Sequence, residues 1–118
     1  MAIAHDTKFK KTARILTKEM VPFIYNVTLV ENVENSQALP ENVRKFAIRA
    51  RKNSGGAYPE VDFAYEADKV PPAVGEVYAS IQDGMPYGED NLRPENQLTL
   101  YLSTPDGGGA IVEIIAWT

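Results

Sequence analysis

The chain has 118 residues, with 12 basic and 16 acidic side chains and a net charge of −4. This length fits one domain with a single hydrophobic core. There is no cysteine and one histidine, His5, which excludes disulfides, thiolate metal sites, a cysteine nucleophile and any site that needs two imidazoles from one chain. The acidic balance argues against a nucleic-acid partner, whose recognition needs a basic surface. No membrane partner is expected either, because the apolar stretches are far shorter than the roughly 20 residues that span a bilayer.

Charge is unevenly distributed along the chain. Residues 1–18 carry five basic side chains and one acidic side chain, a net charge of +4, whereas residues 19–118 carry seven basic and fifteen acidic ones, a net charge of −8. We therefore divide the chain into a basic N-terminal arm, 1–18, and a body, 19–118. The arm is either a solvated terminal segment or a contact for an acidic partner. The candidate partner-contact residues are Lys8, Lys10, Lys11, Arg14 and Lys18.

The secondary structure of the segment 9–20 stays open. Its apolar residues recur at three- and four-residue spacing, which suits a helix face, but its β-branched residues favour a strand nearly as well. A first strand is expected at 23–30, beginning after Pro22, because proline cannot donate to an interior strand ladder. Alternation places one set of side chains on a common face of this strand: Phe23, Tyr25, Val27 and Leu29. The polar stretch 31–42 predicts a loop.

The middle of the chain predicts two more alternating strands, at 43–51 and 61–67, separated by a turn-rich loop. We expect them to form a hairpin. The outer face of the first is basic and that of the second, with Asp62 and Glu66, is acidic and solvated, so cross-strand pairs of opposite charge would contribute about 0.2–1 kcal/mol each. On this interpretation Arg49 and Arg51 are structural; the alternative is that they face a partner.

The last third of the chain continues the strand pattern. A short strand is expected at 76–82, followed by a turn segment at 83–88, and a cleanly alternating strand at 97–103. The connection at 104–109 is hairpin-like, although longer than the tightest turns. The final strand, 110–117, is apolar on both faces except at Glu113, which predicts a central or doubly covered strand.

These elements predict an all-β protein: a single β-sandwich or small jelly roll of six to eight antiparallel strands, with an N-terminal arm. The pattern contains no constellation for catalysis, because the carboxylates alternate along strand faces and His5 lacks any triad motif. Acidic residues around Asp83 and Asp90 do not have the spacing of a recognised calcium loop, so no metal and no cofactor are expected. The protein is therefore not expected to be an enzyme.

Five tyrosines lie in or beside the predicted strands and turns. They are partly buried core residues or, if exposed, an aromatic surface that stacks on sugar rings or lines a protein interface. The set is Tyr58, Tyr65, Tyr78, Tyr87 and Tyr101.

The segment of roughly residues 39–118 resembles the small virion structural proteins of tailed bacteriophages. Four stretches carry the resemblance: Arg44–Arg51, Tyr87–Leu92, Thr99–Ser103 and Val112–Thr118. These motifs are structural. The resemblance implies a capsid decoration, or cement, protein or another head-associated component, and proteins of this kind often have a terminal arm that inserts into the shell.

On this basis we expect a non-enzymatic protein that is made in the host cytoplasm, binds the major capsid protein on the capsid surface of the virion and stabilises the shell. The resemblance also implies a homo-oligomer, with a trimer the favoured state. The alternative is a tail- or fibre-associated module that recognises a glycan or protein of the host surface, for which the tyrosines are the supporting feature.

Overall fold

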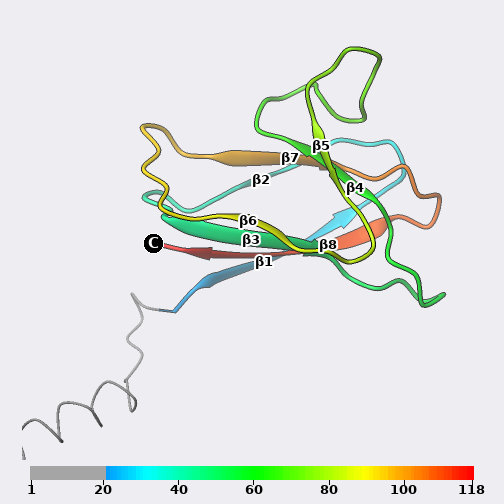
Figure 1. Cartoon of the computed structure of the whole chain (residues 1–118), viewed down its shortest axis with the longest axis horizontal. Coiled ribbons are helices and arrows are strands. Elements are labelled where there is room, and N and C mark those ends of the chain that lie inside the picture. The colour runs from blue at the N-terminus through cyan, green and yellow to red at the C-terminus, as the bar shows by residue number, and fades with distance from the viewer. Residues whose placement is uncertain (1–20) are drawn as a thin grey trace, which may run out of the picture.

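The computed structural model describes residues 21–118, which form two packed antiparallel sheets (Figure 1). Eight strands follow one another along the chain: β1 (Phe23–Leu29), β2 (Asn35–Ala38), β3 (Lys45–Ala50), β4 (Val61–Ala64), β5 (Ala79–Ile81), β6 (Tyr87–Glu89), β7 (Thr99–Ser103) and β8 (Ala110–Trp117). The all-β sandwich predicted from the sequence is confirmed. The predicted arm, with its five candidate contact residues, and the choice between helix and strand for 9–20 lie outside the described residues.

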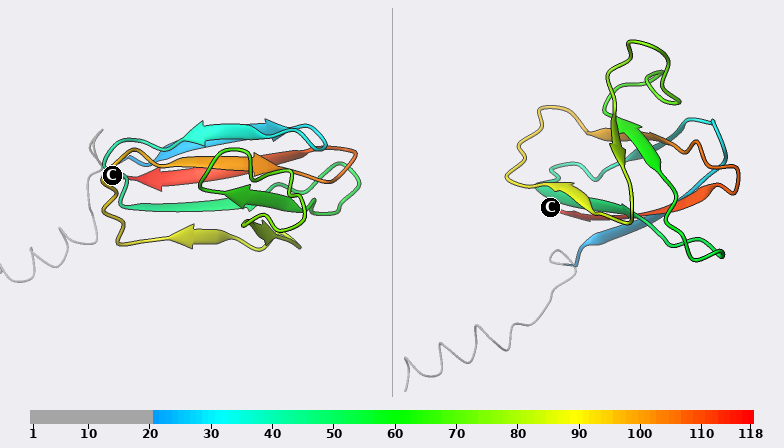
Figure 2. Two further views of the ribbon diagram at one scale, coloured as in Figure 1. Left: turned by 90° about the horizontal axis from the view of Figure 1, so that it is seen from above. Right: turned by 45° about the vertical axis from the view of Figure 1, so that its right-hand side comes forward.

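The strand order is that of a jelly roll. One sheet has the order β1-β8-β3-β6 and the other β2-β7-β4-β5, so the first strand pairs with the last, the second with the seventh, the third with the sixth and the fourth with the fifth. A long hairpin rolled up on itself gives this pattern. Every connection along the chain crosses between the sheets except the one from β4 to β5, which pair in the same sheet. Seen from above, β1 and β2 run along one side of the sandwich and β6 along the other (Figure 2).

The core fills the space between the two sheets. Alternate residues of β3 and β8 point inward, with Phe46 and Ile48 opposed by residues of β4 and β7 such as Phe63 and Leu100. The alternation predicted for 43–51 and 97–103 is thus confirmed. β8 is central, between β1 and β3, as predicted, but only its inward face is fully covered.

Both predicted hairpins are wrong. β3 pairs with β6 and β8, whereas β4 pairs with β5 and β7 in the opposite sheet. Likewise β7 and β8 lie in different sheets, joined by the turn that ends at Gly109. Two strands were also missed, because β2 lies within the predicted loop 31–42 and β6 begins within the predicted turn 83–88.

The predicted solvated acidic face of 61–67 is wrong at Asp62. This side chain is only 2% exposed and accepts a 2.6 Å hydrogen bond from the Ser80 hydroxyl. Its neighbours across the sheet are small, Ser80 on β5 and Ser103 on β7, so the carboxylate fits between them. The described residues contain no helix of the length and apolarity that crossing a bilayer requires.

Candidate functional site

The outward side of the β1-β8-β3-β6 sheet is the first candidate surface, and we call it the outer face. Because Phe46, Ile48 and Ala50 point into the core, their neighbours on β3 point outward. The same alternation applies to β1 and β8. The outer face comprises Ile24, Asn26, Lys45, Ala47, Arg49, Glu113, Ile115 and Trp117, with Arg51 just past the end of β3.

The registers arrange the outer face in rows across the strands. Ile24, Ile115 and Ala47 stand side by side in an apolar row, and Ile24 is 66% exposed. The next row is polar and consists of Asn26, Glu113 and Arg49. An apolar strip beside ordered polar groups is the composition of a protein contact surface, which has an apolar centre and a polar rim.

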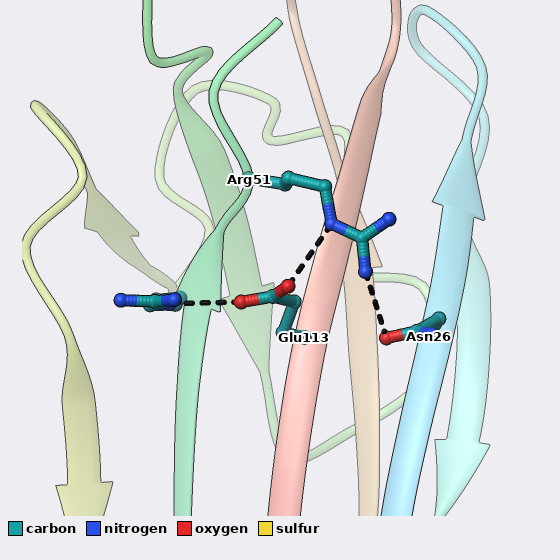
Figure 3. Close-up of polar contacts among 4 residues, drawn as sticks. Asn26, Arg51 and Glu113 are labelled. Atoms are coloured by element: carbon teal, nitrogen blue, oxygen red, sulfur yellow. Dashed lines mark hydrogen bonds and ion pairs between the residues drawn. The ribbon is translucent and has the colours of Figure 1, made fainter.

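Glu113 holds the polar row together. Its carboxylate accepts hydrogen bonds from the Nε atoms of Arg49, at 2.8 Å, and Arg51, at 3.0 Å. Arg51 Nη2 also donates to the side-chain oxygen of Asn26 at 3.3 Å, so the cluster spans β1, β8 and β3 (Figure 3). The two arginine hydrogen bonds lower the pKa of Glu113, and the same contact raises the pKa of Arg49.

These pairs stabilise the fold only slightly. Glu113 retains 27% of its side-chain exposure, and the two arginines retain more, so solvent screens both ion pairs. The contacts nevertheless hold two guanidinium groups against one carboxylate. Arg49 and Arg51 therefore do form ion pairs with a neighbouring strand, but with Glu113 instead of the acidic residues of 61–67.

Trp117 extends the outer face at the C-terminal end of β8. The ammonium group of Lys45 lies 4.9 Å from the centre of its ring, a cation–π contact across β3 and β8. The indole is half-buried, so one large aromatic side chain borders the exposed apolar row. Tryptophan and arginine are the residue types that contribute most to binding at protein interfaces.

The second candidate is a cavity of about 440 Å³, which we call the aromatic cavity. The residues that matter for its chemistry are Phe63, Tyr65, Glu66, Lys69, Tyr78 and Tyr87. They come from both sheets and from the loop between β4 and β5. A cavity of this size with an aromatic lining and a few polar groups is typical of small-molecule sites.

The aromatic rings behind this cavity form one cluster. The ring centres of Phe63 and Tyr87 are 4.8 Å apart. Phe46 lies 6.2 Å from Tyr87, Tyr65 lies 6.3 Å from Phe63, and Phe46 and Tyr65 are 6.5 Å from each other. The Tyr65 and Tyr87 hydroxyls are 3.1 Å apart, and Tyr87 donates to Glu89 at 2.5 Å. Burial is the largest cause that raises the pKa of both phenols.

The predicted tyrosine set is therefore divided by the structure. Tyr65, Tyr78 and Tyr87 line the aromatic cavity, with the first two 43% exposed. Tyr58 lies elsewhere, its ring 5.5 Å from the Lys52 ammonium group, and Tyr101 is a half-buried residue of β7. Within residues 21–118, no three of the His, Asp and Glu side chains are gathered so as to hold a metal ion.

Glu60 is a titratable group that the sequence reasoning missed. Its hydrogen bond with Asp62, and then its burial, raise its pKa to about 7. The spacing of two carboxylates two residues apart on a strand was the available signal, because alternation places both on one face. Neither carboxylate lines the aromatic cavity.

Comparison with known proteins adds little to this picture. No family model matches the chain, and no curated protein matches it. One similar solved structure belongs to the study "Bacillus endospore appendages form a novel family of disulfide-linked pili". The TM-score is 0.37 and the sequence identity is 13%, and the match covers 89% of this chain and 95% of that chain. A likeness this weak supports no conclusion about the chain.

Proposed function

We propose that the protein is a non-enzymatic capsid decoration protein of a tailed bacteriophage, which binds the outside of the shell through the outer face and stabilises it. The observation that carries this proposal is the outer face itself, where the exposed Ile24 and half-buried Ile115 lie beside a preordered Arg49–Glu113–Arg51 cluster. The jelly-roll fold supports it, since viral capsid proteins use this architecture, although lectins do so too.

The action of such a protein is mechanical. Each copy contributes a modest contact to the major capsid protein, and many copies on one shell together oppose its expansion. The arginines need little further ordering on binding, because Glu113 already restrains them, and this reduces the entropic cost of association. The basic arm, through Lys8, Lys10, Lys11, Arg14 and Lys18, is proposed as a second contact with an acidic shell surface.

The experiment is a titration of the full chain onto purified shells that lack it. Replacing Ile115 by lysine on the outer face should reduce occupancy at a fixed concentration by at least about tenfold, because it charges the centre of the apolar row. The control is Ser36→Lys, which adds the same charge at an exposed position of β2 in the other sheet. Equal occupancy by both variants and by the wild type would reject the outer face as the contact.

A separate deletion of residues 2–18 tests the arm. If the arm contributes electrostatically, the deletion lowers occupancy most at low salt, because screening weakens the same contact in the intact chain at high salt. Undiminished occupancy at every salt concentration would remove the arm from the proposal and leave the outer face untouched.

The aromatic cavity favours a second candidate, a tail- or fibre-associated module that binds a host-surface glycan. Two half-exposed tyrosines offer ring faces, while Glu66 and Lys69 offer a hydrogen-bond acceptor and donor for hydroxyl groups. Binding to an array of neutral glycans, lost in Tyr78→Ala and kept in Tyr58→Ala, would favour this function. The control is well matched, because Tyr58 is 44% exposed but lies outside the cavity.

A further inference from the structure

β1 is an edge strand that carries an unusually long free side. The order β1-β8-β3-β6 leaves one side of β1 without a neighbouring strand among the described residues. It has 7 residues, whereas the other three edge strands, β2, β5 and β6, have 4, 3 and 3. A long edge presents a row of backbone donors and acceptors that another strand can use.

Within residues 21–30, no charge, interior proline or bulge protects this edge. Residues 21–30 contain no charged side chain, and their one proline, Pro22, precedes the strand. Four apolar side chains of this stretch are between 44% and 66% exposed: Val21, Phe23, Ile24 and Val30. Native proteins commonly protect an edge by making it short, by adding lysine or proline, or by a bulge. β6, for comparison, is short and ends in Glu89.

The alternation of the ladder identifies the backbone groups that point outward. The Arg51 amide donates to the Ile111 carbonyl at 2.8 Å, so the odd-numbered residues of β8 direct their backbone groups toward β3. The even-numbered ones then bond to β1, where they lie opposite Tyr25 and Val27. Ile24, Asn26 and Thr28 therefore direct their amides and carbonyls toward the free edge.

We propose that this edge pairs with the same edge of a second copy, antiparallel about a two-fold axis at Asn26, and joins the two sheets into one. Ile24 then lies opposite Thr28 of the second copy, and Asn26 opposite its own equivalent. In this register the amides and carbonyls at the free edge of one β1 strand face those of the other. The side chains of Tyr25 and Val27 stay on the core side of the joined sheet. A two-fold contact must be self-complementary, and this strand is.

Charge permits a second copy at this edge and disfavours one on most other surfaces of the body. The body 19–118 carries a net charge of −8, so most of its surfaces repel one another when two copies meet. The β1 edge is uncharged, and it is therefore where two acidic bodies can approach without placing like charges opposite each other. The pairing rests on the edge alone and not on the proposed function, although a dimer would also present two outer faces to a shell.

The first test is sedimentation of the full chain over a wide concentration range. A concentration-dependent dimer is expected, and Asn26→Pro should raise its dissociation constant at least about tenfold, because it deletes both central amide donors of the interface. The same amide bonds no strand inside the described fold, so within the protomer the variant loses only the exposed Asn26–Arg51 side-chain hydrogen bond and should unfold within a few degrees of the wild type. The control Ser36→Lys should dimerise as the wild type does.

A charge exchange tests the register and does not depend on proline. Asn26→Lys and Asn26→Asp each place like charges opposite each other and should weaken self-association, whereas their mixture should form a heterodimer. A wild-type chain that stays monomeric at all concentrations, or forms a trimer indifferent to Asn26, would overturn the proposal. So would dimerisation that appears only after deletion of residues 2–18, which would show that the chain's own arm covers the edge.

Discussion

Two adjacent isoleucines on β8 give the sharpest test of the sandwich. Ile114 is 0% exposed and points into the core, whereas Ile115 points to the outer face and is half-buried. The two residues have the same type, lie on the same central strand and differ in which face they occupy. Ile114→Ala and Ile115→Ala should therefore separate the energy of the core from that of the surface.

The magnitude for Ile114 follows from its burial. The substitution removes three carbon atoms, worth about 0.8 kcal/mol each when fully buried, or about 2.4 kcal/mol in all. The cavity left between the sheets adds to this, so we expect a loss of about 3–4 kcal/mol, within the usual range for isoleucine-to-alanine changes. Ile115 keeps solvent on one side, so its loss should be about 1 kcal/mol.

Urea unfolding monitored by circular dichroism measures both values in one experiment, provided that the slope with denaturant stays unchanged. The melting temperature should fall by more than about 10 °C for Ile114→Ala and by only a few degrees for Ile115→Ala. Losses within about 0.5 kcal/mol of each other would refute the assigned faces of β8. Ile115→Ala should in addition weaken shell binding, which a core substitution that still folds would leave intact.

Three further predictions concern titration and backbone packing. The pKa of Glu60 is raised from 4.5 to about 7, so the folded state favours the protonated form of this side chain. Its contribution to stability is complete below pH 4.5 and is lost as the pH rises through 7. Glu60→Gln should therefore flatten that part of a stability–pH profile measured by thermal melting. The pKa of Glu113 is lowered, so its contribution to the free energy of unfolding is present above pH 4.5 and is lost as the pH falls. Glu113→Gln should remove this pH dependence. In urea unfolding at pH 7 the variant should be less stable by about 1 kcal/mol. Gly88→Ala would place a Cβ 2.5 Å from the Phe46 carbonyl oxygen and should cost about 1–3 kcal/mol, whereas Gly108→Ala, with open space around it, should leave the melting temperature within a few degrees of the wild type.

The sequence predicted which way side chains face more reliably than which strands pair. A two-residue period identifies an inward set such as Phe46 and Ile48, because burial acts on each residue separately. Pairing depends on the connections, and the predicted hairpins β3–β4 and β7–β8 are wrong because the connections after β3 and β7 cross to the other sheet. Nothing in the local pattern of 43–51 distinguishes a crossing from a turn within one sheet.

The two missed strands share a physical reason. β2 has the sequence Asn-Ser-Gln-Ala and β6 has Tyr-Gly-Glu, and both are exposed edges held by one neighbour. Their backbone pairing is imposed by β7 and β3, and their own propensities are weak. Gly88 illustrates the point, because the close approach of the Phe46 carbonyl demands a residue that propensity scales place outside strands.

The candidate site was predictable in its residue types and not in its grouping. Arg49 and Arg51 stood out on an outward face, but their acid, Glu113, is more than sixty residues away and was the one charged residue in an apolar strand. The tyrosines likewise stood out, but only the meeting of β4 and β6 brings Tyr65 and Tyr87 together. Contacts between residues far apart in sequence are set by topology, which a single sequence does not reveal.

The three surfaces proposed for binding can be tested one at a time, although the outer face and the β1 edge share Ile24 and Asn26. The outer face depends on side chains such as Ile115 of β8, the β1 edge on backbone groups of Asn26, and the aromatic cavity on side chains such as Tyr78 at the other edge. Ile115→Lys should leave the β1 edge and the aromatic cavity intact. Dimer formation that survives Ile115→Lys, together with shell binding that is lost, would place self-association and shell recognition on different atoms. Because paired subunits bind a repeating lattice at two points, Asn26→Pro should then weaken shell occupancy through lost bivalency as well as through the lost Asn26–Arg51 hydrogen bond, most strongly at low protein concentration.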